Sequence, residues 1–246
     1  MASSWEKITV GSRDMDLYLS LPAGSGPFPA VLIGPDAGGV DRFIQWAADQ
    51  LAEEGYATAA PDLFHEMGED ATAGDSQRTQ NLNDAGLSAG IAAAMDFLQN
   101  YQNHQNHAPI AQGKIGVTGF GIGGRAAWLA AAASPKFNAS VPFYGADIMA
   151  PRSDDAGSPF TLAGGIACPI MFHFGEDDED PSQADMRTLD AELTRLGKPH
   201  QFFVYPGAGH AFMDPASPHY RKGPSQAAWI RTLEFFTVHL KGLPIR

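Results

Sequence analysis

The stretch IGVTGFGIGGR at residues 115–125 decides the fold that this sequence predicts. Residues 115–118 form a short run suited to a buried strand, and residues 125–133 have the spacing of a helix. Glycines fill most of the turn between them, at positions 119, 121, 123 and 124. A sharp turn from a strand into a helix brings neighbouring backbones too close for a Cβ atom, so it favours glycine. The stretch therefore predicts a strand, a tight turn and a helix in direct succession.

The same alternation of strands and helices extends through most of the 246 residues. The first two strands read as an antiparallel pair, and the later segments alternate as in a parallel sheet with helices on both faces. The predicted strands are 5–10, 15–21, 30–33, 56–60, 115–118, 140–144, 169–174 and 201–205. The predicted helices are 43–54, 87–101, 125–133, 181–196 and 225–240. We expect one α/β domain over residues 1–246, with a long polar loop at 65–80 bordering the ligand site at the carboxyl ends of the strands.

The composition excludes several classes of function. With 28 acidic and 16 basic residues, the net charge is −12, which argues against nucleic acid or an anionic membrane as a partner. The single cysteine, Cys168, excludes an intramolecular disulfide. The N-terminus has no signal-peptide pattern, and no apolar run reaches the ~18 residues of a membrane helix. The spacing of the histidines suggests no metal site. We expect a cytoplasmic protein without a metal or cofactor.

The turn at residues 119–124 has two interpretations beyond a tight glycine turn. In the nucleophile elbow G-x-Nu-x-G, small residues flank an exposed nucleophile, and Gly121 stands in the position of that nucleophile. Gly119, Gly121 and Gly124 also fit G-x-G-x-x-G, the dinucleotide-binding fingerprint. That fingerprint normally lies in the first βαβ unit with an acid ~20 residues later. Here the turn lies in the middle of the chain and lacks that acid.

Two later segments favour the hydrolytic interpretation. The strand at 169–174 leads into the acidic run GEDDEDP at 175–181, and the last strand leads into GAGHAF at 207–212. Nucleophile, acid and histidine follow one another in the order of the α/β-hydrolase triad. His210 is therefore the candidate base, and an acid of the run at 175–181 is its candidate partner.

Five segments resemble the dienelactone hydrolases, and together they extend over nearly the whole chain. They are LAEEGYATAAPDLF at 51–64, GFGIGGRAA at 119–127, FYGA at 143–146, PIMFHFGEDD at 169–178 and YPGAGHAF at 205–212. The resemblance implies an α/β-hydrolase fold, a monomer and an elbow cysteine that Gly121 replaces here. The family's acid corresponds to Asp178, with Asp177 and Asp180 as alternatives, and its histidine corresponds to His210.

The resemblance also implies residues that assist the triad. A family glutamate that contacts the thiol before activation corresponds to Asp36, a shorter acid. By analogy with the hydrolase elbow, the backbone N–H groups of Ala37 and Ile122 form the oxyanion hole.

Two further residues are candidates for contact with the substrate. Phe120 lies at a strand end and could line an apolar pocket or pack in the core, and Arg78 in the long loop could hold a substrate carboxylate or lie solvated at the surface. The family has another arginine shortly after its catalytic histidine, but this chain reads MDP at 213–215. Dienelactone itself is therefore not predicted as the substrate.

Gly121 leaves the mechanism open, because covalent catalysis needs an attacking atom. The chain could be a variant of a cysteine hydrolase, or the vacated space could hold a water that His210 activates, with Asp178 orienting His210 and Asp36 assisting. A ligand-binding protein without turnover is the alternative, and a dinucleotide-binding protein is a weaker one. The retained acid and histidine favour hydrolysis of a small ester or lactone, and Gly121→Cys is expected to raise that activity.

Overall fold

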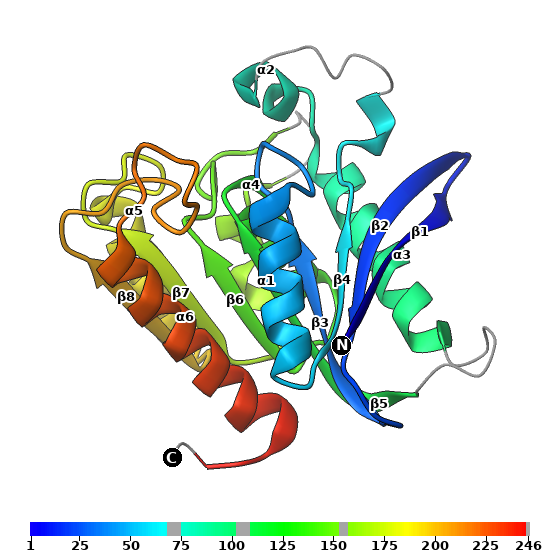
Figure 1. Cartoon of the computed structure of the whole chain (residues 1–246). Helices are drawn as coiled ribbons and strands as arrows, with labels where there is room; N and C mark the ends of the chain where they lie inside the picture. Colours follow the sequence, from blue (N-terminus) through cyan, green and yellow to red (C-terminus); the bar gives the residue numbers. More distant parts are fainter. Residues whose placement is uncertain (68–74, 102–108, 153–156, 245–246) are drawn as a thin grey trace.

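An eight-stranded sheet organises the chain (Figure 1). The computed structural model describes residues 1–67, 75–101, 109–152 and 157–244. The strands are β1 (Ala2–Val10), β2 (Arg13–Leu21), β3 (Phe28–Gly34), β4 (Ala57–Pro61), β5 (Ile110–Phe120), β6 (Ala139–Phe143), β7 (Ile170–Gly175) and β8 (His200–Tyr205). Their order in the sheet is β1-β2-β4-β3-β5-β6-β7-β8. Strand β2 is antiparallel to both of its neighbours, and the strands from β3 to β8 are parallel to one another.

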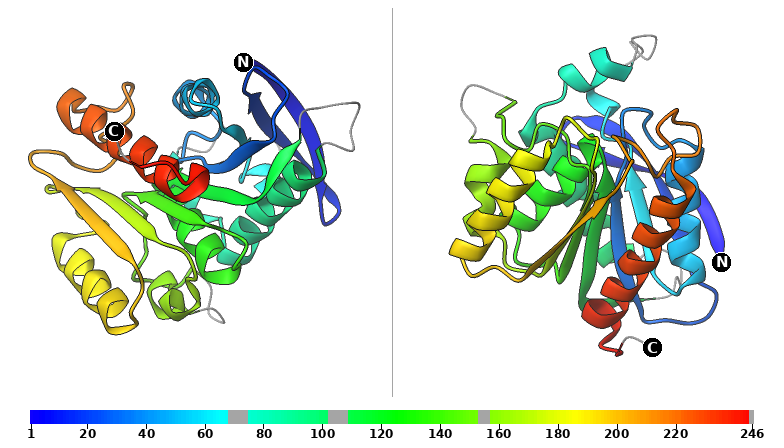
Figure 2. Two further views of the ribbon diagram at one scale, coloured as in Figure 1. Left: turned by 90° about the horizontal axis from the view of Figure 1, so that it is seen from below. Right: turned by 90° about the vertical axis from the view of Figure 1, so that its left-hand side faces the viewer.

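Helices cover both faces of this sheet. The helices are α1 (Arg42–Glu53), α2 (Asp75–Gln80), α3 (Asp84–Asn100), α4 (Ile122–Ala133), α5 (Gln183–Arg195) and α6 (Lys222–Phe236). Figure 2 shows α1 and α6 on one face and α3, α4 and α5 on the other. Successive residues of β3 pack on opposite faces of the sheet. Val31 belongs to the core on the side of α1 and α6, and Leu32 belongs to the core on the side of α3, α4 and α5. Such a strand is apolar at every position because both of its faces are buried. The predicted fold class, a mostly parallel sheet with antiparallel N-terminal strands, is confirmed.

The turn from β5 into α4 shows why glycines are needed there. A Cβ on Gly123 would lie 2.0 Å from the carbonyl oxygen of Gly34, at the end of β3. A Cβ on Gly119 would lie 2.0 Å from the carbonyl oxygen of Gly123. Helix α4 therefore starts in backbone contact with β3 and β5, and packing alone accounts for these glycines. Gly121 has a φ of +53°, a conformation that residues with a side chain rarely adopt.

A buried ion pair holds α4 against α3. The Arg125 side chain is fully buried, and its Nε and Nη2 donate to the two carboxylate oxygens of Asp84 at 2.7 Å each. The guanidinium also donates to the carbonyl oxygens of Asp147 and Ala150 in the loop after β6. This pair joins three elements around the turn, and its partners lie too far apart in the sequence to have been predicted.

The largest differences from the sequence prediction lie in three segments. Strand β5 begins at Ile110, five residues before its predicted start at residue 115. Within the predicted loop 65–80, a 3-10 turn forms at His65–Met67 and a short helix at Asp75–Gln80, while residues 68–74 lie outside the described residues. A further 3-10 helix, Pro159–Gly165, precedes β7. These short helices lack the long apolar periodicity that sequence prediction relies on.

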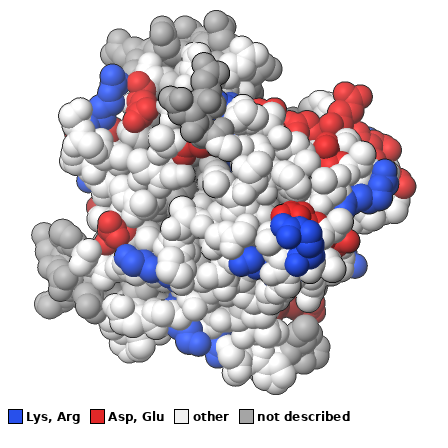
Figure 3. Space-filling model, turned by 180° about the vertical axis from the view of Figure 1, so that it is seen from behind, with Lys and Arg blue, Asp and Glu red and all other residues white. Residues whose placement is uncertain are grey.

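The charge is unevenly spread over the surface. On the face shown in Figure 3, acidic side chains gather on one side, whereas basic side chains are dispersed. Among the helices of the described residues, none is both long enough and apolar enough to cross a bilayer.

Candidate active site

The ends of four parallel strands carry the predicted site residues. Asp36 follows β3, Gly121 follows β5, Asp178 follows β7 and His210 follows β8. Parallel strands place their carboxyl ends at the same edge of the sheet, where ligands bind in open α/β sheets. A cavity of about 820 Å³ lies at this edge, and its lining includes Asp36 and His210.

His210 and Asp178 form a hydrogen-bonded pair. The Nδ1 atom of His210 lies 3.2 and 3.3 Å from the carboxylate oxygens of Asp178 and 3.1 Å from the carbonyl oxygen of Asp180. These acceptors favour a proton on Nδ1, which leaves Nε2 as the basic nitrogen. Burial lowers the pKa of His210, but the hydrogen bond and charge of Asp178, with the charges of Asp36 and Asp180, outweigh it and raise the pKa overall.

Of the three candidate acids, Asp178 is the one whose carboxylate contacts His210. The carboxylate of Asp180 instead accepts the backbone N–H of Asp147 at 2.8 Å. Asp177 donates its backbone N–H to the carbonyl oxygen of Ala208 at 2.8 Å. The geometry therefore supports Asp178 as the partner of the histidine.

The carboxylate of Asp36 occupies the space in which a side chain at position 121 would begin. A Cβ on Gly121 would lie 2.1 Å from Oδ1 of Asp36, 2.6 Å from its Cγ and 2.8 Å from its Oδ2. A cysteine at position 121 does not fit beside Asp36 in this position. The interpretation in which a water fills a vacated space is wrong for this arrangement, because the acid predicted to assist fills that space itself.

The two predicted oxyanion-hole donors face Asp36. The N–H of Ala37 donates to Oδ1 of Asp36 at 2.8 Å. The N–H of Ile122 faces the same carboxylate and, like that of Ala37, stabilises its charged form. Burial nevertheless raises the pKa of the Asp36 carboxyl, and the charge of His210 and the two N–H groups reduce that shift. While Asp36 holds these donors, a substrate carbonyl cannot use them.

The cavity has an acidic lining that the sequence analysis did not identify. Asp41 and Asp214 line it together with Asp36, and Arg152 contributes a guanidinium. Arg152 is already paired with the carboxylate of Asp147. Asp214 belongs to the segment in which the family was expected to carry an arginine. The lining therefore disfavours an anionic substrate.

Phe120 and Arg78 both lie outside the described lining of the cavity. Phe120 is fully buried, with its ring centroid 4.8 Å from those of Phe43 and Phe143, so it packs in the core, and its contact with the substrate stays a prediction. As a strand residue, it points into a face of the sheet rather than beyond its edge. The guanidinium of Arg78 lies over the ring of Phe64, 4.5 Å from its centroid, and outside the described lining of the cavity. Its role toward a carboxylate stays a prediction.

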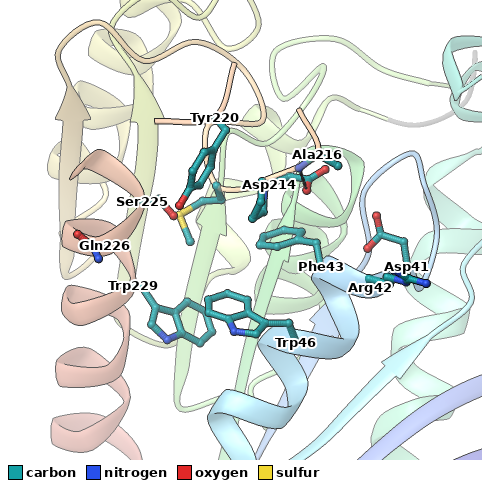
Figure 4. A pocket seen from close by; sticks show the side chains of 12 residues that line it. Asp41, Arg42, Phe43, Trp46, Asp214, Ala216, Tyr220, Ser225, Gln226 and Trp229 are labelled. Carbon is teal, nitrogen blue, oxygen red and sulfur yellow. Dashed lines mark hydrogen bonds between the residues drawn. The ribbon is translucent and has the colours of Figure 1, made fainter. Parts of the chain in front are cut away.

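An apolar groove of about 430 Å³ continues the cavity between α1 and α6 (Figure 4). Trp46 of α1 and Trp229 of α6 lie side by side in it, with ring centroids 5.2 Å apart, and Phe43 and Tyr220 complete its aromatic lining. The residues that line both spaces are Asp41, Phe43, Asp214 and Ala216. The groove can hold an apolar group of a molecule whose reacting atoms lie near His210.

Comparisons with known proteins agree with this architecture. The sequence model of the dienelactone hydrolase family matches residues 15–240. A Bradyrhizobium protein assigned as a 2-oxo-3-(5-oxofuran-2-ylidene)propanoate lactonase is 31% identical over 251 residues, covering 98% of this chain and 96% of the relative. A Methylorubrum extorquens protein assigned as a carboxymethylenebutenolidase is 30% identical over 235 residues, covering 94% of this chain and 79% of the relative.

A crystal structure assigned as a dienelactone hydrolase from Klebsiella pneumoniae superposes with a TM-score of 0.83 at 25% identity, covering 96% of this chain and 99% of the other. The chain is thus an α/β-hydrolase. It belongs to the dienelactone hydrolase family. This membership confirms the family and the hydrolase class predicted from the sequence.

Proposed function

We propose that this protein hydrolyses a small, neutral ester or lactone, with His210 as the general base. The observation that carries the proposal is the pair of His210 and Asp178, formed at the wall of the cavity with Nδ1 held by the carboxylate. A protein that only bound a ligand would have no need of a histidine oriented by a buried acid. Family membership supports the same class of reaction.

The attacking group in this proposal is a water in the cavity beside His210, not one in the space above Gly121. Nε2 of His210 takes a proton from a water as that water attacks the acyl carbon, and the imidazolium then returns the proton to the leaving alkoxide. Asp178 stabilises the imidazolium through Nδ1 and fixes the ring orientation. The N–H groups of Ala37 and Ile122 stabilise the oxyanion once the Asp36 carboxylate has moved away from them.

The lining of the site disfavours a substrate that carries a carboxylate. Asp36, Asp41 and Asp214 would repel a substrate carboxylate, and Arg152 is already paired. The groove beside Trp46 suits an apolar or aromatic substituent. Two relatives are assigned as a lactonase and a carboxymethylenebutenolidase, which supports lactones and related esters as the substrate class.

The test is the rate of phenyl acetate hydrolysis by His210→Ala. Loss of a general base should lower kcat/KM by about 10²–10⁴-fold. His200→Ala is the matched control, because His200 also contacts an aspartate, Asp190, at 3.0 Å but outside the described lining of the cavity. An unchanged rate in His210→Ala would contradict the proposal, as would an equal loss in both variants.

The location and assembly of the protein stay predictions. A cytoplasmic, monomeric enzyme without a nucleic-acid or membrane partner fits the acidic composition and the small-molecule cavity. Gel filtration and cell fractionation would test these two points separately from activity.

A further inference from the structure

The carboxylate of Asp36 lies where a reacting group of the site would lie. Its carboxylate lies over Gly121, at the point where the family would carry its nucleophile, and it lines the cavity that also contains His210. The N–H of Ala37 holds Oδ1 at 2.8 Å, and the N–H of Ile122 faces the same group. A nucleophile, a pair of N–H donors and a base are therefore assembled without any side chain at position 121.

The position of the donors decides which bond this carboxylate can attack. Attack on an ester carbonyl creates an oxyanion on the substrate, and that oxyanion needs the donors that Asp36 already holds. Attack on a saturated carbon creates no such oxyanion. It converts Asp36 itself into an ester whose carbonyl oxygen remains beside the N–H groups of Ala37 and Ile122. The ester that this arrangement is ready to hydrolyse is thus one formed on Asp36.

The charge of the cavity selects the electrophile. Displacement of a halide would release an anion beside Asp41 and Asp214, where it would be repelled. An epoxide releases no separate anion, because its oxygen stays attached and only needs a proton. His210 lines the same cavity and can supply that proton. The apolar groove that Trp46 and Trp229 line can hold an aryl substituent on the epoxide ring.

We propose that the protein hydrolyses small aryl or alkyl epoxides through a covalent ester of Asp36. In the first step, a carboxylate oxygen of Asp36 bonds to a ring carbon, the C–O bond of the epoxide breaks, and the oxygen takes a proton from His210. In the second step, His210 takes a proton from water, which attacks Cγ of Asp36. The tetrahedral intermediate collapses, the leaving oxygen takes the proton from His210 to complete the diol, and Asp36 is freed as a carboxylic acid. Its proton passes to His210, which restores the carboxylate and the imidazolium of the starting state. This proposal rests on the roles of Asp178 and His210 proposed above.

The experiment uses styrene oxide as the probe and diol formation as the readout. Asp36→Asn should lower diol formation by about 10³-fold or more, because the amide is a poor nucleophile. Asp16→Asn is the matched control, since Asp16 is an exposed aspartate on β2 that pairs with Lys7 at the surface. His210→Gln should abolish diol formation as well, because His210 supplies the proton of the first step and is the base of the second.

A single turnover in water labelled with heavy oxygen separates this route from direct attack by water. The covalent route places the label in the carboxylate of Asp36, whereas direct attack places it in the diol. Three results would each overturn the proposal: label in the diol, full activity in Asp36→Asn, or no turnover by the wild type. Bromide release from phenethyl bromide at a rate comparable to epoxide opening would overturn the choice of electrophile. Failure of the ester-hydrolase proposal would instead appear as unchanged phenyl acetate hydrolysis in His210→Ala.

Discussion

A cysteine at position 121 has no room while Asp36 keeps its place. The Cβ of Gly121→Cys would lie 2.1 Å from Oδ1 of Asp36, whereas an ordinary contact is 3.4 Å or more. The carboxylate must therefore move away by at least ~1 Å. That movement breaks the charge-assisted hydrogen bond from Ala37, worth about 1.5–3 kcal/mol. The positive φ of residue 121 adds about 1–2 kcal/mol of strain. Gly121→Cys should therefore destabilise the fold by about 2.5–5 kcal/mol.

A double-mutant cycle with Asp36→Ala tests this reasoning. Without the carboxylate, Gly121→Cys should cost only the strain, about 1–2 kcal/mol, in urea unfolding. The double variant should also show a burst with an activated aryl ester, because the thiol gains both room and free oxyanion donors. The single variant should show a much smaller burst. Equal costs of Gly121→Cys in the two backgrounds would refute the contact on which the estimate depends.

Three further outcomes follow from the same geometry. The pKa of His210 is raised, and the base must be neutral, so the rate of ester hydrolysis should rise with pH through a midpoint above 6.5. Asp178→Asn should move that midpoint down. A midpoint that the substitution leaves unmoved would count against the pair of His210 and Asp178. Asp84→Ala should lower the free energy of unfolding by about 3–5 kcal/mol because it leaves Arg125 buried and unpaired, whereas the exposed Asp96→Ala on the same helix should change it by less than about 0.5 kcal/mol. Trp46→Ala should raise KM for phenyl acetate by about tenfold without raising it for ethyl acetate, and equal effects would remove the groove from substrate binding.

The sequence sufficed for the parts of the site that are local in the chain. The turn after β5, the acid after β7 and the histidine after β8 each follow a recognisable strand, and parallel strands bring their ends together. The acidic run left Asp177, Asp178 and Asp180 as candidates. The choice among them depends on which carboxylate points toward His210, and the sequence does not show this.

The remaining features depend on approaches between segments far apart in the chain. No local pattern shows that the carboxylate of Asp36 reaches the space above Gly121, because that contact depends on β3 and β5 being neighbours with Gly34 opposite Gly119. The Asp36 carboxylate fills the space that a side chain at position 121 would occupy. This fit supports a role for Gly121 in the site, rather than a simple loss of the nucleophile. Arg152 escaped prediction because it lies in an irregular loop with no motif.

The most direct test of the account is to measure both activities of Asp36→Ala against the wild type. The account predicts opposite changes, since the substitution frees the N–H groups of Ala37 and Ile122 for an ester carbonyl but removes the nucleophile for an epoxide. Phenyl acetate hydrolysis should rise by about tenfold or more, because a single oxyanion donor is worth about 10²–10³-fold, and styrene oxide hydrolysis should be lost. A fall in ester hydrolysis together with retained epoxide hydrolysis would contradict the role assigned to Asp36.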